Sequence, residues 1–402
     1  MALKKYALSD VCTIVPGFAF KSNEFGSGEN IAVKIKDIEP PSVNIKNAER
    51  VCFTPQDKFR LSKGDYIMAM TGATIGKVGK LQIDAKNVYI NQRVCKFNPI
   101  TSVCDKEYLY YVLSAPSFRN FIYNNVDSKL AQPNIGHPTI YKYTHLFPTD
   151  IKEQKLIASV LNNIDRKIEL NKQINDNLEA MAKQLYDYWF VQFDFPNEEG
   201  KPYKSSGGAM VWNENLKRKI PQGWNDCKIK DFMRIFTGKK DVSKAVPGNY
   251  KFFSCAPEPI SSNEYIYDGY AVLVSGNGSY TGRVGFYKGK FDLYQRTYAC
   301  VLDEDEHNIS FFYYTLRYLF QPIYSGGKHG SSIPYIVLGD LADFRFAFNE
   351  TICTKFVDAT KPMFDEQLLR QKEIEVLTKQ RDELLPLLMN GQATVNYHLS
   401  DD

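Results

Sequence analysis

The chain carries the same pattern of residues twice, and this repeat constrains its fold more than any other feature. Residues 8–17 (LSDVCTIVPG) match residues 229–238 (IKDFMRIFTG), 221 positions further on. The match continues in the same order through GKVG at 76–79 and GRVG at 282–285, Gln92-Arg93 and Gln295-Arg296, Tyr110-Tyr111 and Tyr313-Tyr314, and two leucine pairs at 178/185 and 377/384. Two copies of one globular unit, each followed by one long helix, are therefore expected to present two similar surfaces at a fixed separation.

Composition sets the outer bounds of function. A chain of 402 residues is too long for one ordinary core, so two units of roughly 200 residues are expected. The formal net charge is only +4, so a surface that binds a polyanion has to be local. Eight cysteines without a CxxC pair, and no signal peptide, indicate reduced thiols in a cytoplasmic protein. No apolar run approaches the ~18 residues that cross a bilayer, so no membrane partner is expected.

Patterns typical of catalytic, cofactor or metal sites are missing from the sequence. TGATIGKVG has three residues rather than four between Gly72 and Gly76, and Val78 follows its lysine, so it is not a phosphate-binding loop. SGNGSYTGRVG has Thr281 where a dinucleotide fingerprint needs its third glycine. The five histidines are dispersed without metal-ligand spacing. We therefore expect no catalytic residue, no cofactor and no metal.

Each globule is predicted to be mixed, with helices and strands. Short β-favouring runs on both sides of a glycine loop predict a strand, a tight turn and a returning strand in residues 64–81 and 270–291. A short helix is expected to follow at 107–122 and 310–324. The interval from Gly17 to Gly76 is 59 positions, against 44 from Gly238 to Gly282, so the first copy carries fifteen additional residues.

Two long helices carry the clearest periodicity. Apolar residues in a four-three spacing predict one seam along each helix, formed by Ile157, Leu161, Ile164, Ile168, Leu178, Leu185, Ile374, Leu377, Leu384 and Leu388. Asn171 and Asn175 interrupt the first seam, either as buried residues that set register or as a solvated stretch. The second seam is expected to begin after Pro362, bend near Pro386 and stop at Gly391. Two such seams favour an antiparallel coiled coil.

The stretch between the halves is rich in Gly, Pro, Ser and charge, without either period, and is predicted to be a connector. Its Lys217-Arg218-Lys219 cluster is interpreted as a solvated charge run rather than a phosphate contact. The expected division is a first globule at 1–150, a helix at 151–192, a linker at 193–220, a second globule at 221–352, a helix at 353–391 and a tail at 392–402.

Several of these segments together resemble the specificity subunit of Type I restriction-modification systems. They are GATIGKVG, INQRV at 90–94, AQPNI at 131–135, FPTDIKEQKLIASVLNNIDRKIELNKQIN, the joint WFVQFDFPNEEGKPYKSSGGAMV with PQGW, and the ending RDELLPLLMNGQ. The resemblance covers essentially the whole chain. It implies two target-recognition domains that each read one half of a bipartite, asymmetric double-stranded DNA site. It further implies helices that pair as a spacer and dock two methyltransferase subunits, with restriction subunits joining through the complex. The second globule departs from the first at 328–332, where KHGSS replaces SKLAQ.

Loop residues that suit DNA recognition occur in both globules, because Arg, Lys, Asn, Gln, Ser and Thr pair with base edges or phosphates. The candidates are Lys21, Ser22, Asn23, Thr71, Thr74, Lys77, Lys129, Gln132 and Asn134 in the first copy, and Lys239, Lys240, Asn277, Ser279, Tyr280, Arg283, Lys328 and His329 in the second. The repeated Gln-Arg pairs lie in strand-like runs and are interpreted as structural.

The sequence is also compatible with two other classes of function. One is a stand-alone bipartite DNA-binding regulator without an enzymatic partner. The other is an enzyme, which the sequence disfavours, because the nearest string to an NPP[YF] amide-methylation motif is Asn98-Pro99-Ile100, without the second proline and the aromatic residue.

Overall fold

The chain forms two compact units that share both long helices. The computed structural model describes residues 2–126, 133–303, 306–330 and 332–395. Unit 1 comprises Met1–Leu170 with Glu373–Asp402, and unit 2 comprises Asn171–Lys372. The helices α5 (Ile151–Tyr186) and α9 (Glu350–Met389) therefore each contribute one part to each unit. A globule thus packs with part of both helices, rather than with only the helix that follows it in sequence.

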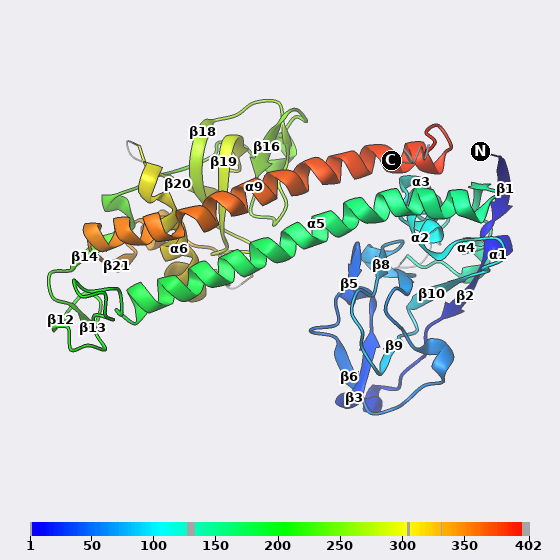
Figure 1. Cartoon of the computed structure of the whole chain (residues 1–402), viewed down its shortest axis with the longest axis horizontal. Coiled ribbons are helices and arrows are strands. Elements are labelled where there is room, and N and C mark those ends of the chain that lie inside the picture. The colour runs from blue at the N-terminus through cyan, green and yellow to red at the C-terminus, as the bar shows by residue number, and fades with distance from the viewer. Residues whose placement is uncertain (1, 127–132, 304–305, 331, 396–402) are drawn as a thin grey trace, which may run out of the picture. The chain divides into compact units, whose positions relative to one another are not determined.

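Unit 1 is built on a six-stranded sheet in the order β2-β10-β7-β8-β5-β4, a three-stranded sheet β6-β3-β9 and a strand pair β1-β11. Its strands are β1 Leu3–Ala7, β2 Cys12–Pro16, β3 Phe25–Val33, β4 Ile38–Glu39, β5 Ser42–Val43, β6 Glu49–Val51, β7 Tyr66–Ala69, β8 Val78–Lys80, β9 Val88–Ile90, β10 Val94–Pro99 and β11 Thr144–Pro148. Its short helices are α1 Leu8–Val11, α2 Lys106–Ser114, α3 Pro116–Asn124 and α4 His137–Ile140. In Figure 1 the strands β3, β6 and β9 lie at the end of unit 1 away from α5.

The helix expected at 107–122 is two helices. Asp105 caps α2, since its carboxylate accepts from the backbone N–H groups of Glu107 at 3.0 Å and Tyr108 at 3.1 Å. Ala115 is extended, with φ −67° and ψ 146°, and Pro116 then occupies the first turn of α3. Proline suits that position because the N–H it lacks has no partner there. Residues 108–113 of α2 are all buried, so this helix covers the sheet on one face and meets α5 on the other.

Unit 2 repeats this arrangement. Its six-stranded sheet has the order β15-β20-β18-β19-β16-β17, with the strand pairs β14-β21 and β12-β13. Its strands are β12 Met210–Asn213, β13 Arg218–Pro221, β14 Asn225–Lys228, β15 Arg234–Thr237, β16 Tyr250–Phe253, β17 Ile260–Ser262, β18 Tyr267–Ser275, β19 Val284–Leu293, β20 Thr297–Val301 and β21 Arg345–Phe348. Its short helices are α6 Ile309–Thr315, the π-helical turn η9 Leu316–Phe320, α7 Gln321–Tyr324 and α8 Leu338–Ala342.

The strand orders confirm the repeat that the sequence predicts. The first five strands of the two orders occupy equivalent positions, and β5 runs parallel to β8 just as β16 runs parallel to β19. The sixth strand differs, because β4 precedes β5 in the chain whereas β17 follows β16. The predicted strand, glycine turn and returning strand are the antiparallel pairs β7-β8 and β18-β19. The strands β3 and β6 lie in the interval where unit 1 has its fifteen additional residues.

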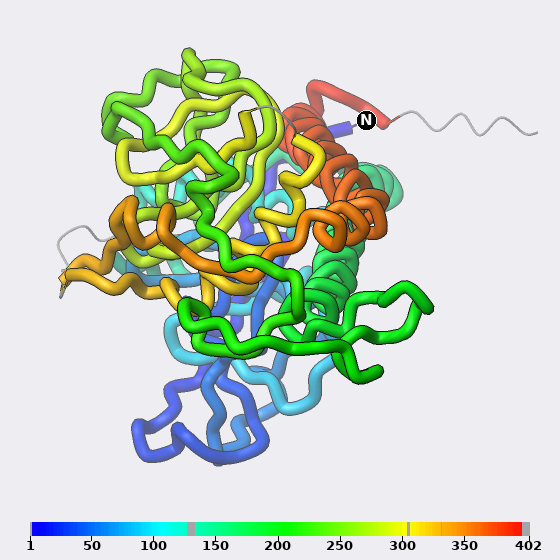
Figure 2. The backbone as a smooth tube through the Cα atoms, turned by 90° about the vertical axis from the view of Figure 1, so that its left-hand side faces the viewer, coloured from blue at the N-terminus to red at the C-terminus, as the bar shows by residue number. Residues whose placement is uncertain are grey.

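The stretch predicted to be a connector joins the two halves as an ordered segment that packs on the core of unit 2. Phe193 is 1% exposed, Phe195 5% and Trp224 7%, and residues 210–221 form the hairpin β12-β13. Arg218 donates to the Val191 carbonyl at 2.7 Å and lies over the Phe193 ring at 4.5 Å, so it is not a solvated charge. Figure 2 shows this segment in green, turning back on itself after the end of α5. Aromatic residues that do not follow a helical or strand periodicity can still be buried, because irregular backbone can direct individual side chains into the core.

The second long helix also differs from expectation. It begins at Glu350, runs through Pro362 and Pro386, and ends at Met389. A proline inside a helix removes one hydrogen bond, but the neighbouring Phe356 and Phe364 are 0% and 7% exposed, and their burial outweighs that loss. Among the described helices, neither long helix nor any other is apolar enough over 18 residues to cross a membrane.

Candidate nucleic-acid interface

Four loops of unit 1 meet at one end of the neighbouring strands β2, β10 and β7. Gly17 donates its N–H to the Val94 carbonyl at 2.8 Å, which joins the first loop to the turn before β10. Met70 donates to the Arg93 carbonyl at 2.9 Å, and Ile135 donates to the Met70 carbonyl at 3.0 Å. Gly72 donates to the Pro133 carbonyl at 2.9 Å. We call residues 17–23, 70–74, 91–94 and 133–135 the loop cluster of unit 1.

Unit 2 contains the same cluster, held by equivalent backbone hydrogen bonds. Gly276 donates to the Arg296 carbonyl at 2.9 Å, Ile336 donates to the Gly276 carbonyl at 2.9 Å, and Gly278 donates to the Pro334 carbonyl at 3.0 Å. These three bonds correspond to those of Met70, Ile135 and Gly72 in unit 1. The loop cluster of unit 2 consists of residues 238–241, 276–281, 294–297 and 333–336. Loops that differ in most of their side chains are thus held by equivalent backbone hydrogen bonds in the two units.

A glycine at the end of the duplicated segment is required by close approach. A Cβ at Gly17 would lie 1.9 Å from the Asn91 carbonyl oxygen, and one at Gly238 would lie 1.5 Å from the Leu293 carbonyl oxygen. Both distances are far inside van der Waals contact, so no other residue fits without moving the turn. In unit 1, Gly17 therefore allows the loop at 17–23 to pack against the loop at 91–94.

The unit 1 candidates fall into three groups. Lys21, Ser22 and Asn23 are exposed on the first loop, and Asn134 is exposed on the fourth. Thr71 and Thr74 lie in the cluster, but their hydroxyl oxygens are buried, without a hydrogen-bond partner among the described residues. Half-buried Lys77 lines a cavity of about 250 Å³ with Arg119, Asp165 and Arg381 instead of facing the loops. Lys129 and Gln132 lie outside the described residues.

The unit 2 candidates divide in a similar way. Exposed side chains are those of Lys239, Ser279, Tyr280, Lys328 and His329. His329 lies outside the loop cluster as defined but is held against it, with its Nε2 3.1 Å from Asp340 Oδ2 and its ring stacked 5.2 Å from that of Tyr335. Asn277 is half-buried, and its backbone bridges to Tyr335.

Two of the unit 2 candidates are engaged inside the protein, so the structure does not favour them as DNA contacts. Lys240 pairs with Glu264 and, at 3.2 Å, with the buried Asp292. The Arg283 guanidinium donates to the Ala256 carbonyl at 2.6 Å and to the Pro257 carbonyl at 3.3 Å, and burial lowers its pKa. Their intramolecular partners lie 24 or more positions away in sequence, so no local pattern could indicate them.

The Gln-Arg pairs lie within the two loop clusters. They lie in turns rather than strands, and Gln92, Arg93, Gln295 and Arg296 are all exposed. The interpretation of these residues as parts of strands is therefore wrong. The first turn lies between the end of β9 and the start of β10, and the second lies between the end of β19 and the start of β20. The signal that could have found them was their repetition in both copies.

The long helices pair antiparallel inside each unit, as predicted. In unit 1, Lys167 pairs with Glu373 at 2.5 Å and Asp165 with Arg381 at 3.2 Å. In unit 2, Gln367 donates to the Asn175 carbonyl at 3.3 Å, and Arg370 donates to Asn171 Oδ1 at 3.3 Å. Asn171 is 1% exposed, so it is a buried seam residue and not part of a solvated stretch.

The predicted seam residues face inward. Ile157, Leu161, Ile168, Ile374 and Leu388 are buried, and Ile164, Leu178, Leu185, Leu377 and Leu384 are half-buried. Pairing nevertheless leaves large apolar side chains uncovered on both helices. They are Leu170, Val376 and Leu387 in unit 1, exposed by 54%, 48% and 41%, and Met181, Tyr188 and Leu369 in unit 2, exposed by 55%, 37% and 58%.

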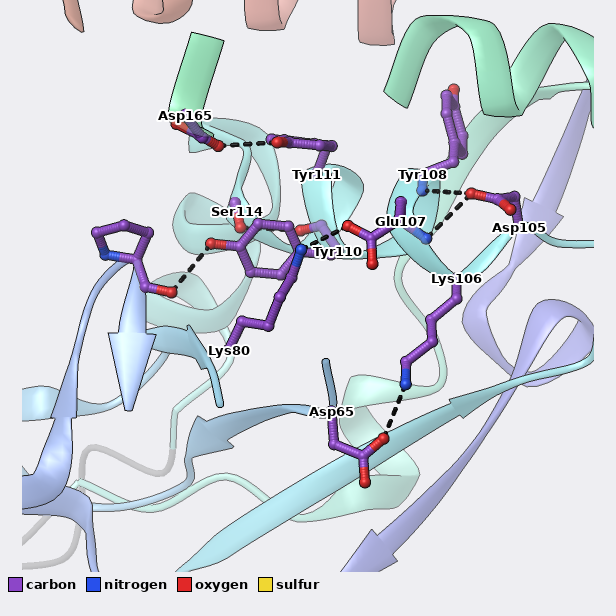
Figure 3. A network of polar contacts seen from close by, with 11 residues as sticks. Asp65, Lys80, Asp105, Lys106, Glu107, Tyr108, Tyr110, Tyr111, Ser114 and Asp165 are labelled. Carbon is purple, nitrogen blue, oxygen red and sulfur yellow. Dashed lines mark hydrogen bonds and ion pairs between the residues drawn. The ribbon is translucent and has the colours of Figure 1, made fainter. Parts of the chain in front are cut away.

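A network of tyrosines and carboxylates joins the globule of unit 1 to its helices. The Tyr111 hydroxyl donates to Asp165 Oδ2 at 2.8 Å, and Figure 3 shows the ring of Tyr111 directed from α2 toward Asp165 on α5. Burial and the adjacent Asp165 carboxylate raise the pKa of Tyr111, so its hydroxyl keeps its proton and remains a donor. Lys80, also in Figure 3, is 7% exposed and pairs with Glu107 at 2.5 Å. These groups are all engaged in binding α2, and no cluster of His, Cys, Asp or Glu with metal-ligand geometry occurs in the described part of the chain.

Comparison with known proteins agrees with this geometry. The family described as "Type I restriction modification DNA specificity domain" matches residues 2–180 and 221–348, one match for each globule. The Type I restriction enzyme MjaIX specificity subunit of Methanocaldococcus jannaschii is 27% identical over 319 residues, which cover 72% of this chain and 69% of the relative. The Type I restriction enzyme EcoDI specificity subunit of Escherichia coli is 33% identical over 182 residues, which cover 44% of this chain and 40% of the relative.

The fold has also been seen before. The crystal structure of a Type I restriction-modification system S subunit from M. genitalium aligns with a TM-score of 0.59 at 17% identity, over 96% of both chains. Since the family matches more than half of the chain and falls on both globules, and the related proteins are named specificity subunits, the chain belongs to the Type I restriction modification DNA specificity family and is a non-catalytic specificity subunit that recognises DNA.

Proposed function

We propose that each unit reads one half of a bipartite, asymmetric DNA target through its loop cluster. The observation that carries the proposal is the shared frame: three equivalent backbone hydrogen bonds hold both clusters, while the side chains they display differ. Exposed Asn134 of unit 1 corresponds to exposed Tyr335 of unit 2, and exposed Ala73 corresponds to exposed Ser279. Different donors and acceptors on one frame match different base patterns, so the two half-sites differ.

The exposed candidates supply the chemistry for base and phosphate contacts. They are Lys21, Ser22, Asn23 and Asn134 in unit 1, and Lys239, Ser279, Tyr280 and Lys328 in unit 2, with Asn277 half-buried beside them. Amide groups pair with adenine edges, hydroxyl groups with several bases, and lysines with phosphates or guanine. The net charge of +4 is small, so these lysines provide a local attraction rather than a general one. Lys129 and Gln132 stay predictions.

We further propose that the paired helices dock two methyltransferase subunits, through which restriction subunits join the complex. Exposed leucine, valine, methionine and tyrosine side chains along α5 and α9 support this, because such residues are costly to leave in water. In unit 2 a shallow apolar groove of about 590 Å³ is lined by Met181, Leu185, Tyr188 and Met363 among others. Equivalent exposed residues occur on the helix parts of unit 1, which fits two docking events.

A domain exchange tests the bipartite reading. The chain is expressed with its methyltransferase partners, and the methylated sites are mapped by single-molecule methylation sequencing. Replacing residues 1–150 with the same region of another family member is expected to change one half-site and leave the other half and the gap intact. A swap that changes both half-sites, or neither, contradicts the proposal.

Point variants sharpen the same test. The double variant Lys21→Ala with Asn23→Ala is expected to relax the bases read in one half-site, and Ser279→Ala with Tyr280→Ala those of the other, by about tenfold in discrimination for each lost base contact. The control is Lys152→Ala, an exposed lysine at the start of α5 outside both loop clusters. If the control relaxes the target as much as the loop variants do, the loops are not the reading surface.

The docking surface has its own test. Met181→Asp with Leu369→Asp places charge on two side chains that are more than half exposed, so the fold is expected to survive. Co-purification of the methyltransferase subunits should fall at least tenfold, with the thermal midpoint unchanged. Asn177→Asp, on an exposed position of the same helix, is the matched control. Undiminished co-purification of the double variant would place docking elsewhere.

The gap between half-sites is proposed to depend on helix length. The helices have 36 and 40 residues, and deleting seven residues from each removes about 10 Å at 1.5 Å per residue. Deleting 171–177 with 370–376 is therefore expected to shorten the gap by about three base pairs, since one DNA turn of ~10 base pairs spans ~34 Å. Altered bases in either half-site would contradict a purely spacing role.

A further inference from the structure

The fourth loop of each cluster is held by the same backbone bridge but displays a different side chain. In unit 1 the backbone of Asn134 bridges to Thr71, and in unit 2 the backbone of Tyr335 bridges to Asn277. Both bridges are antiparallel, and each joins the second loop of its cluster to the fourth. Asn134 and Tyr335 therefore occupy equivalent places, so that one unit exposes an amide where the other exposes an aromatic ring.

Contacts within unit 2 position the Tyr335 ring at the surface. His329 donates its N–H to the Tyr335 carbonyl at 3.3 Å, and Tyr335 donates its N–H to the His329 carbonyl at 3.0 Å. The two rings stack with their centroids 5.2 Å apart and an interplanar angle of 29°. His329 is itself fixed, with its Nε2 3.1 Å from Asp340 Oδ2. The tyrosine ring is thus held by its neighbours, while 37% of Tyr335 stays exposed.

The same loops of unit 2 expose further apolar side chains. Ile333 is 63% exposed and Tyr280 48%, and the loop of Tyr280 lies against the fourth loop, since the Thr281 hydroxyl is 2.9 Å from the Pro334 carbonyl. Unit 1 has the polar residues Gln132 and Thr74 at the positions of Ile333 and Tyr280. Large apolar groups are costly to leave in water, so this part of unit 2 suits a partner that offers an apolar group in return.

The apolar group that DNA presents in its major groove is the C5 methyl group of thymine, whereas an asparagine amide pairs with the edge of adenine. From this contrast we propose that the Tyr335 ring, with Ile333 beside it in sequence, contacts a thymine methyl group in the half-site of unit 2. Tyr335 is then a specificity-determining residue, and that half-site contains a thymine that is recognised by apolar contact. This inference rests on the proposed function, since it assumes that the loop cluster of unit 2 faces the major groove of DNA.

The test replaces each thymine of the mapped target with deoxyuridine, one position at a time, and measures binding of the full chain to each duplex. This replacement removes the methyl group and keeps the base pair. The half-site of unit 2 is the one that stays unchanged when residues 1–150 are exchanged. The wild-type chain is expected to lose about fourfold in affinity at one or more thymines of that half-site, which corresponds to burial of one methyl group.

Three variants assign this effect to the ring. Tyr335→Asn places the unit 1 residue in unit 2 and should bind the thymine and uracil duplexes equally at that position. Tyr335→Phe keeps the ring and should keep the fourfold difference. The control is Tyr265→Asn, which changes a tyrosine that is 43% exposed and precedes β18, whereas the loop cluster follows that strand. It should also keep the fourfold difference.

Two results with the wild-type chain would overturn the proposal without any variant: a unit 2 half-site that contains no thymine, or equal binding of the thymine and uracil duplexes at every position. A Tyr335→Asn chain that keeps the fourfold difference would also overturn it. If Tyr335→Phe loses the difference, the hydroxyl group and not the ring recognises the base, and the proposal is wrong. Failure of the proposed function would appear separately, as a wild-type chain with the same affinity for the mapped target and for a duplex with both half-sites scrambled.

Discussion

The junctions between globule and long helices in the two units both use a carboxylate of α5, but they place it among different neighbours. In unit 1 the junction is polar, with Tyr111 donating to Asp165, which also pairs with Arg381. In unit 2 the Tyr318 hydroxyl donates to Glu179 Oε1 at 2.6 Å, and aromatic packing accompanies this contact, with Phe356 5.2 Å from Phe190 and 6.0 Å from Tyr314 between ring centroids. Tyr314 corresponds to Tyr111 in the repeat. Both junctions therefore retain a tyrosine-carboxylate hydrogen bond, and in unit 2 the Tyr318 ring also stacks 5.7 Å from that of Tyr314.

The largest effect is expected in the aromatic junction. Phe190 is 4% exposed and lies 4.9 Å from Phe311 and 5.8 Å from Trp224. Phe190→Ala should lower the free energy of unfolding by about 3–5 kcal/mol, because it removes buried ring surface and leaves a cavity. Urea unfolding measures it. Tyr188→Ala, at a neighbouring position that is 37% exposed, should cost under about 1 kcal/mol. Equal costs for the two variants would mean that the aromatic cluster is not tightly packed.

The polar junction of unit 1 is expected to respond to loss of its acceptor. Asp165→Ala leaves the Tyr111 hydroxyl without its acceptor, while the Arg381 guanidinium keeps Asp382 at 2.8 Å, and the change should cost about 2–3 kcal/mol in urea unfolding. The Asp165 and Arg381 side chains are only 19% and 24% exposed, so water compensates in part. Asp165→Asn keeps an acceptor for Tyr111 and should cost less. If the asparagine variant is as unstable as the alanine variant, the charge matters more than the tyrosine hydrogen bond.

The stability of unit 1 is expected to depend on acid pH through a histidine that unit 2 lacks at the matching position. His145 of unit 1 is 8% exposed, and burial lowers its pKa from 6.5 to about 4, whereas the matching position in unit 2 is Phe346. Below about pH 6.5 the unfolded chain takes up a proton that the folded chain does not. Stability is therefore full above that pH and falls as the pH drops toward 4.

His145→Phe places the unit 2 residue in unit 1 and should remove this contribution. Between about pH 7.5 and pH 5 the wild-type free energy of unfolding is expected to fall by about 2 kcal/mol more than that of the variant. Urea unfolding at both pH values measures the difference, and other titrating groups affect both proteins alike. Parallel pH profiles would show that His145 does not keep its depressed pKa.

The smallest effect concerns the glycine turns. The Thr281 hydroxyl of unit 2 donates to the Gly278 carbonyl at 2.7 Å and contacts the Pro334 carbonyl at 2.9 Å, where unit 1 has the apolar Ile75. Thr281→Val should cost about 1 kcal/mol, because those carbonyls lose a donor. Ile75→Val is the matched change and should cost about 1 kcal/mol through packing alone. Only the first is expected to loosen base reading in its half-site by methylation sequencing. An unchanged half-site would mean that the hydroxyl adds stability but does not set loop geometry.

Local sequence patterns predicted much of the fold and part of the candidate site. The strand and turn pattern around Gly76 and Gly282 predicted two antiparallel pairs, and the four-three spacing predicted two helices that pair. Local patterns failed where burial opposed them. Pro362 indicated a helix start, but the buried Phe356 before it continues the helix. Polar composition indicated a free connector, but Phe193 packs in a core.

For the site, residue type indicated which side chains could contact DNA but not which were available. Lys239 and Lys240 are adjacent and chemically identical, yet Lys239 is exposed and Lys240 is paired with Asp292, 52 positions away. The Gln-Arg pairs failed for a related reason, since two residues between strand-like runs do not reveal a turn. Availability is set by partners distant in sequence, which residue type alone does not encode.

The repeat and the apolar period can be read from the sequence without its fold, and they predicted a duplicated globule with two amphipathic helices. The folded chain shows which loops meet, which parts of α5 and α9 belong to each unit, and which lysines and arginines are already engaged. Those outcomes depend on close approach and burial between residues far apart in the chain. Gly17 shows both levels: the repeat makes it visible, and the Asn91 carbonyl 1.9 Å from its missing Cβ explains why it must be glycine.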